Sequence, residues 1–230
     1  MHHYLDIRRI KRLSFFGSAA VAVGLISMVV GIILAFSSPE TSGLVLSTSF
    51  AGLIISQLGF QLRTRWARHP RIDELLDEAL KGLDERHAIF HYLLGASHAL
   101  VTPAGVFAVC TTTLEGDVAF THGRWVHTPP PGRSGRTPKP RTLAEPSRQA
   151  ETEVTQLKKT LARRLPARAD LSLQPLLVFL HPNAQIESQG SPFRALHVKK
   201  LKAYLRALPR GETLSQAEVR TLAQTLGQEA

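Results

Sequence analysis

The sequence predicts a mixed α/β domain that follows two membrane-spanning helices. Two long runs without charged residues lie near the N-terminus, at residues 14–36 and 43–62. Beyond them, apolar residues recur first at helical spacing and then in short runs typical of strands. The segments follow the order helix, three strands, helix, strand, short strand, helix. This order is typical of an α/β sandwich built on a mixed sheet.

The N-terminal segment, residues 1–13, is basic, and so is the chain as a whole. Lys and Arg number 28 against 18 Asp and Glu, which gives a formal charge of +10. A basic balance suits nucleic acid or an anionic membrane surface as a partner. Cys110 is the only cysteine, which excludes an intrachain disulfide and a zinc site made of cysteines.

Residues 14–62 are predicted to form a transmembrane helical hairpin. The first run has 23 uncharged positions, and a helix needs about 20 apolar residues to cross the hydrocarbon core. A secretory signal peptide is the rival interpretation, because basic residues precede the run. The length of the run and the second span directly after it favour a retained helix. The lipid bilayer is therefore the first predicted partner.

The flanks of the hairpin predict its orientation. Basic residues precede the first span and follow the second, whereas the loop between them carries Glu40 and no Lys or Arg. The basic residues are Arg8, Arg9, Lys11, Arg12, Arg63, Arg65, Arg68 and Arg71. The positive-inside rule then places both termini in the cytoplasm, with the chain in the inner or cytoplasmic membrane.

Small residues form one helical face in each span. They are Ala20, Gly24, Ser27 and Gly31 in the first span, and Gly43, Ser47 and Ala51 in the second. Small side chains let transmembrane backbones approach closely. The pattern predicts that the two spans pack against each other.

Residues 63–94 are predicted to form an amphipathic linker helix. Apolar residues recur at i, i+3, i+4, i+7, i+8 and i+11 from Ile72 onward, and acidic residues fill the other face. The nuclease-like α/β domain then spans residues 95–208. Strands are predicted at 98–102, 106–113, 118–121 and 124–128, joined as an antiparallel meander by Pro- and Gly-containing turns.

A mobile basic loop is predicted at residues 129–146. Pro, Gly and basic residues dominate it, and no period is visible. Its basic residues are Arg133, Arg136, Lys139 and Arg141. Two interpretations stay open, a set of phosphate contacts and a solvated loop near an anionic membrane, and the composition favours the second.

The rest of the chain alternates helices and short strands. A helix is predicted at 147–165, a strand buried on both faces at 176–180, and an edge strand at 195–198. The basic helix 199–208 carries Lys199, Lys200 and Lys202, which are further candidates for phosphate contacts. The C-terminal segment 209–230 contains a helix that opens with the capping box Ser215-x-x-Glu218.

The middle of the chain resembles the nuclease-related domain family, often called NERD. The family's landmarks are met in order by Ser97-His98, Pro103-Ala104-Gly105, Cys110-Thr111-Thr112, Glu115-Gly116, Trp125 and Glu145-Pro146-Ser147-Arg148-Gln149. The resemblance covers roughly residues 88–208. It implies a restriction-endonuclease-like core, in which carboxylates hold Mg²⁺ or a similar ion for phosphodiester hydrolysis.

The catalytic positions of that family are altered here. Its Asp falls on Ser97, its Glu on Cys110 and its Lys on Thr112. Its helix-motif Asn falls on Glu145, while Pro146 and Gln149 are retained. Hard cations prefer carboxylate oxygens, and neither a thiol nor a hydroxyl replaces the missing charges. The departures predict a domain without catalytic residues, metal or cofactor, which serves as a binding or scaffolding module.

Two other functions stay open. In the first, the chain is an active membrane-tethered nuclease whose carboxylates have moved, with Glu85, Glu151 and Glu153 as candidates on helices. In the second, it is an accessory subunit of a cell-envelope membrane complex. A protein partner of unknown identity is expected, and the basic residues leave nucleic acid as a second candidate. His87 and His91 have the spacing of a zinc pair on a helix, but no third ligand accompanies them.

Overall fold

The computed structural model describes residues 1–37, 42–132, 138–143, 145–168, 171–209, 211 and 213–229. The chain divides into two compact units. One unit is Ile7–Arg71, and the other joins Met1–Asp6 to Ile72–Ala230. Glu40 lies outside the described residues.

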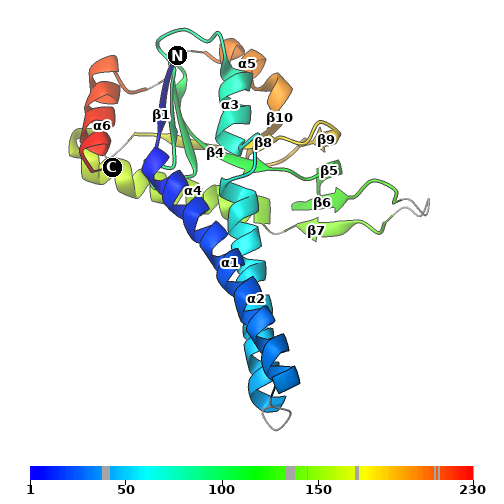
Figure 1. Ribbon diagram of the computed structural model, residues 1–230. Helices are drawn as coiled ribbons and strands as arrows, with labels where there is room; N and C mark the ends of the chain where they lie inside the picture. Colours follow the sequence, from blue (N-terminus) through cyan, green and yellow to red (C-terminus); the bar gives the residue numbers. More distant parts are fainter. Residues whose placement is uncertain are drawn as a thin grey trace. The chain divides into compact units, whose positions relative to one another are not determined.

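The unit Ile7–Arg71 contains two antiparallel helices, α1 (Ile7–Ser37) and α2 (Ser42–Trp66), packed side by side (Figure 1). Both helices are long and apolar enough to cross a membrane. Large apolar side chains that face outward include Phe15, Phe16, Ile26, Ile33, Phe36, Leu46, Phe50 and Phe60. This surface suits a hydrocarbon environment, and the hairpin agrees with the prediction for residues 14–62.

Glycines bring the two helices into close contact. A Cβ added at Gly24 would lie 2.6 Å from the Gly52 carbonyl oxygen, and one at Gly59 would lie 2.6 Å from the Val21 nitrogen. Ser27 Oγ also donates a hydrogen bond of 2.9 Å to the Thr48 carbonyl. The predicted small-residue face of the first span is therefore confirmed.

The predicted face of the second span is wrong. Ser47 and Ala51 are exposed, and a Cβ added at Gly43 would meet nothing within 4 Å. Gly52 and Gly59 form the face instead, spaced seven residues apart. A step of seven is close to two full helical turns, as in the series Gly17, Gly24 and Gly31 on α1. The two glycine series can therefore face each other along the helices.

The other unit is built on a mixed sheet, here sheet A, which is six-stranded in the described part of the chain. Its strands in spatial order are β1 (His2–Leu5), β2 (Ala88–His91), β3 (His98–Thr102), β4 (Gly105–Thr112), β8 (Leu173–Phe179) and β10 (Arg194–His197). β2, β3 and β4 pair antiparallel, whereas β1 with β2, β4 with β8, and β8 with β10 pair parallel. The predicted mixed α/β class is confirmed.

Strand β8 is central and buried on both faces, as the apolar run 176–180 predicts. Leu176, Leu177, Val178 and Phe179 are each at most 2% exposed. Leu176 and Val178 pack on one side of the sheet, whereas Leu177 and Phe179 pack on the other. The neighbouring β10 is an edge strand, also as predicted.

A second sheet, sheet B, breaks the predicted meander. Its order is β7 (Arg141–Leu143), β6 (Arg124–Thr128), β5 (Gly116–Thr121) and β9 (Ala184–Glu187). β5 does not pair with β4, because β8 already occupies the free edge of β4. Gly116, at φ +96°, lets the chain turn out of sheet A at this point. Strand β7 also lies inside the segment that the sequence predicted to be a loop.

Helices cover both faces of sheet A (Figure 1). They are α3 (Ile72–Leu80), α4 (Glu145–Arg164), α5 (Val198–Ala207) and α6 (Gln216–Glu229), with a 3₁₀ turn η2 (Pro166–Arg168) after α4. Leucines of α3 and α5 pack with Ile89, Leu100 and Phe107 on one face. Residues of α4 and α6 pack with Phe90 and Val101 on the other.

Two predictions around β2 are wrong. The linker helix ends at Leu80 instead of residue 94, and Gly82 turns the chain at φ +79°. Residues 88–91 form β2, in which all four side chains are buried. The N-terminal segment is also more than a basic tail, because β1 pairs with β2. A strand that is buried between β1 and β3 needs apolar residues on both of its faces, whereas an amphipathic helix needs them on one face only.

Candidate functional site

Strand β4 carries the two positions, Cys110 and Thr112, at which the predicted resemblance expects charged residues. Alternation along the strand places Cys110 and Thr112 on the same face. Cys110 is 1% exposed and packs in a cluster with Trp125, Phe179 and Ala150 of α4. Thr112, at the end of β4, is half-buried. The strand therefore presents these two side chains together, as its alternation predicts.

Ser97, the third altered position, binds a carboxylate from α4. The Ser97 backbone N–H donates to Glu153 Oε2 at 2.6 Å, and its Oγ–H donates to Glu153 Oε1 at 2.7 Å. Ser97 lies in the turn before β3, and both residues are half-buried. Both carboxylate oxygens are thus engaged by one serine, which fixes the turn to the helix.

A glycine permits this close approach of turn and helix. Gly95 has φ +78°, and a Cβ there would lie 2.6 Å from Thr160 Oγ1 and 3.3 Å from the Gln156 carbonyl oxygen. Any larger residue would push the turn away from α4. Gly95 therefore helps to hold Ser97 within hydrogen-bonding distance of Glu153.

The Cys110 thiol is neutral at physiological pH. Burial, and after it the negative charge of Glu153, raises the pKa of Cys110 to about 12. Reactive cysteines instead have a lowered pKa and a partly exposed thiol. Cys110 therefore behaves as a small apolar residue of the core and is neither a nucleophile nor a ligand for a hard cation.

The retained helix motif lies beside this cluster. Pro146 is buried at the start of α4, and Gln149 is half-buried one turn later. Gln149 and Glu153 line a shallow hollow with Arg148 and Thr152. The side chain of Glu145, where the family has Asn, lies outside the described part of the structure.

Of the three carboxylates proposed to have moved toward β4, only Glu153 lies near these positions. Glu151 is exposed on α4. Glu85 is not on a helix; it lies in the turn between α3 and β2 and lines a separate pocket. Among the described residues, no group of three or more His, Cys, Asp or Glu side chains could hold a metal ion.

His87 and His91 do not form a zinc pair on a helix. His87 Nδ1 donates to Asp84 Oδ1 at 2.6 Å, and that aspartate also accepts from Arg86 Nε at 2.9 Å. These interactions, led by the Arg86 hydrogen bond, lower the pKa of Asp84 to about 2. His91 lies on β2 and is completely buried.

His91 belongs to a polar chain on the α3 face that the sequence does not reveal. His3 Nδ1 and His91 Nε2 donate to Asp77 Oδ1 at 2.6 Å and 3.0 Å. His91 Nδ1 lies 2.7 Å from His98 Nδ1, so that one ring donates to the other. Burial alone would raise the pKa of Asp77, but the interactions with His91 and His3 outweigh it and lower that pKa. The sequence pattern did not predict this polar chain, because it did not predict β1, the strand that brings His3 to Asp77 of α3.

The predicted phosphate contacts are scattered. Arg133 and Arg136 lie outside the described residues, whereas Lys139 and Arg141 are exposed before and on β7. Lys199 and Lys200 line a hollow beside β9 and β10 together with Arg194 and His197. Lys202 instead donates to the Lys81 carbonyl. Among the candidates that the structure describes, Lys199 and Lys200 line the same hollow.

No family model, curated protein or solved structure matches this chain. The resemblance to nuclease-related domains and the restriction-endonuclease-like core stay predictions.

Proposed function

We propose that the chain is a membrane-anchored, restriction-endonuclease-like domain that has lost catalysis and serves as a binding or scaffolding module. The observation that carries the proposal is the pairing of Ser97 with Glu153 beside the buried Cys110. Ser97 and Cys110 are two of the positions where the resemblance to nuclease-related domains leads us to expect catalytic charges.

The chemistry of the cluster supports the loss of catalysis. Metal-dependent phosphodiester hydrolysis needs carboxylates that are free to hold the cation, and a positive charge near the scissile phosphate. Both oxygens of Glu153 already accept hydrogen bonds from Ser97. Cys110 keeps its proton because its pKa is raised to about 12, and Thr112 is neutral. The same contacts join the turn, the strand and the helix, so they suit a structural role.

Strand β1 supports a hairpin with both ends on one side of the membrane. β1 precedes α1 in the chain, and it pairs with β2, which follows α2. The two segments can pair only if they emerge on the same side. The basic flanks of the spans then favour the cytoplasmic side.

Cysteine labelling tests this orientation. Cys110 is the only native cysteine and is buried, so a membrane-impermeant maleimide should label it little. In intact cells, Glu40→Cys should be labelled from outside, whereas Arg124→Cys on exposed β6 should react only after lysis. The opposite pattern would place the domain outside the cytoplasm.

The hollow that contains Lys199 and Lys200 is the proposed contact surface for an anionic partner. Arg194 adds a third cation to it, and both lysines are exposed. An acidic protein surface is the partner that we propose. Nucleic acid is the second candidate, and its binding would weaken steeply with salt.

Crosslinking of the full chain in native membranes, followed by mass spectrometry, tests the binding role. We expect a recurrent protein partner that is lost when Lys199→Glu and Lys200→Glu are combined. Lys158→Glu with Lys159→Glu is the matched control, because it reverses two exposed charges on α4. Equal recovery of the partner by both double variants would exclude the hollow as the contact surface. Recovery of nucleic acid alone would contradict the protein-partner proposal.

A further inference from the structure

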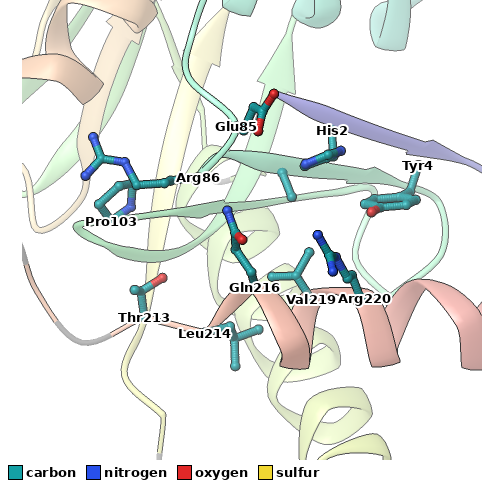
Figure 2. Close-up of a pocket in the computed structure, with 11 residues that line it drawn as sticks. His2, Tyr4, Glu85, Arg86, Pro103, Thr213, Leu214, Gln216, Val219 and Arg220 are labelled. Carbon is teal, nitrogen blue, oxygen red and sulfur yellow. The ribbon is translucent and has the colours of Figure 1, made fainter.

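A pocket of about 300 Å³ lies between the N-terminal strand and the C-terminal helix of the α/β unit (Figure 2). Its walls come from β1, from the start of β2 and the turn before it, from Pro103, and from residues 213–220. It shares no residue with the cluster of Ser97, Cys110 and Glu153. Segments from both ends of the sequence therefore meet around one cavity.

The floor of the pocket is apolar. Ala88, Leu214 and Val219 are each at most 7% exposed. The Tyr4 ring forms one wall and stacks on Phe90 with ring centroids 4.7 Å apart. A cavity of this size with apolar walls and a few polar groups is typical of sites for small molecules.

Charged and polar side chains surround the opening. His2, Glu85, Arg86 and Arg220 line the pocket and are exposed. Arg86 is already paired with Asp84, since its Nε and Nη2 donate to Asp84 Oδ2 at 2.9 Å and 2.5 Å. The Arg220 guanidinium makes no hydrogen bond or ion pair with the residues that the structure describes. Arg220 thus offers an uncompensated cation at the edge of an apolar cavity.

Thr213, one of the residues that line the pocket, has a buried hydroxyl group. Thr213 Oγ1 is buried and has no hydrogen-bond partner among the described residues. Buried hydroxyl groups usually have a partner, because an unsatisfied one is costly. In Figure 2, Thr213 and Arg220 lie on opposite sides of Leu214 and Val219.

We propose that this pocket binds a small amphipathic carboxylate, with its acyl or aromatic body on the apolar floor and its carboxylate paired with Arg220. A guanidinium matches a carboxylate through two parallel hydrogen bonds. A phosphate dianion would draw on a second cation, and the nearby Arg86 is already engaged by Asp84. The cavity volume limits the body to roughly the size of a medium-length acyl chain.

Ligand binding at this site would stabilise the docked position of β1. The ligand would contact His2 or Tyr4 on β1 and Val219 on α6 at the same time. β1 is separated from α1 by Asp6 alone. Because a ligand stabilises the state that binds it, occupancy would favour pairing of β1 with β2. The pocket would thereby couple a small carboxylate to the segment that leads into the membrane hairpin.

Equilibrium dialysis of radiolabelled octanoate against the full chain in lipid nanodiscs tests the proposal, with empty nanodiscs subtracted. Saturable binding at one site is expected. Octanamide, the uncharged isostere, should bind at least tenfold more weakly than octanoate. Arg220→Gln should weaken octanoate binding by a similar factor. Each change removes one charge-assisted interaction, and a loss of about tenfold is typical of that. Arg124→Gln removes an equal charge from exposed β6 and should leave binding unchanged.

A second variant and a competitor complete the test. Val219→Phe should abolish binding by filling the cavity, with circular dichroism confirming that the variant is folded. If it fails to fold, Arg220→Gln at its exposed position still decides the test. The proposal is overturned by the absence of saturable binding to the wild type, or by equal octanoate affinity in Arg220→Gln. Equal affinity for octanamide, or displacement of octanoate by equimolar inorganic phosphate, also overturns it.

Discussion

The two faces of sheet A carry polar clusters of different composition. On the α4 face, Ser97 and Glu153 surround a position where Cys110 is buried and neutral. On the α3 face, Asp77 accepts hydrogen bonds from His3 and His91, and His91 continues to His98. In the first cluster, Ser97 and Cys110 stand at positions where the predicted resemblance expects catalytic charges, and Glu153 supplies its carboxylate. The second joins titratable groups of β1, α3 and β2 to His98, a landmark of the resemblance to which no catalytic role is assigned.

This difference shows that a residue's position in a sequence motif does not by itself determine what chemistry its side chain can perform. In the α4 cluster, which the resemblance predicts to be a catalytic site, the hydrogen bonds between Ser97 and Glu153 connect the turn before β3 to α4. The α3 cluster shows no local motif, because His3, Asp77 and His91 come from β1, α3 and β2. It nevertheless contains Asp77, whose pKa is lowered by its interactions with His91 and His3 against the opposing effect of burial. Measurements that separate the two faces therefore test the account directly.

The largest effect is expected in β8, which supports both faces. Phe179→Ala should lower the free energy of unfolding by about 3–5 kcal/mol, because it leaves a cavity beside Trp125 and Cys110 on the α4 side. Val178→Ala removes a smaller group from the opposite face and should cost less. Chemical denaturation of the full chain in micelles measures both. An unchanged stability in Phe179→Ala would contradict the burial of β8.

A smaller effect is expected from Asp77 on the α3 face. Asp77→Asn should lower the free energy of unfolding by roughly 1–2 kcal/mol at neutral pH, since it weakens charge-assisted hydrogen bonds to His3 and His91 in a half-exposed setting. Asp77→Asn and His3→Ala should be less than additive when combined. Full additivity would show that the two residues do not interact.

The contribution of Asp77 to the free energy of unfolding should decrease in acid. Its pKa is lowered below the ordinary value of 3.8, so the folded state binds this proton less readily than the unfolded state. The stabilisation is therefore present above pH 3.8 and is lost as the pH falls through the lower, folded-state pKa. Melting temperatures of wild type and Asp77→Asn should differ at pH 6 and converge in acid. A difference in melting temperature that widens in acid would contradict the lowered pKa of Asp77.

The smallest effect is expected at Ser97. Ser97→Ala removes the Oγ–H bond to Glu153 but leaves the backbone N–H bond, so a loss of about 0.5–1.5 kcal/mol is expected. The same substitution in a Glu153→Gln background should cost less, because the acceptor is then uncharged. A loss larger than that of Asp77→Asn would make the α4 cluster the more important of the two for stability.

The sequence predicts those elements whose pattern is local. The apolar run at 176–180 identifies β8, the capping box identifies the start of α6, and both bonds of that box are formed, at 2.7 Å and 3.2 Å. β2 was missed, because Ala88-Ile89-Phe90 is buried on both faces only through pairing with β1 and β3. No local pattern shows that the first residues of the chain cross to a strand 86 positions later, where His2 pairs with Ala88.

In the candidate site, too, local sequence patterns predict some features, whereas others depend on contacts between distant segments. The alternation of β4 predicts that Cys110 and Thr112 share a face, and the helical register leaves three carboxylates as candidates to approach it. Glu85 lies in the turn before β2 and Glu151 is exposed, and the packing of α4 on the sheet brings Glu153 to Ser97. The pocket beside Arg220 depends on β1 and α6 together, so a single segment of sequence does not reveal it.

The most direct test of the central claim is a plasmid-nicking assay of the full chain in nanodiscs with Mg²⁺ or Mn²⁺. The assay requires the full chain, because a fragment that begins at residue 70 would lack β1 and with it one strand of sheet A. We predict that supercoiled plasmid stays intact over a wide range of protein concentration, because Glu153 is engaged by Ser97 and Cys110 is neutral. Chelator-sensitive nicking that is lost in Glu153→Ala and kept in Glu151→Ala would contradict the account and restore a displaced catalytic site.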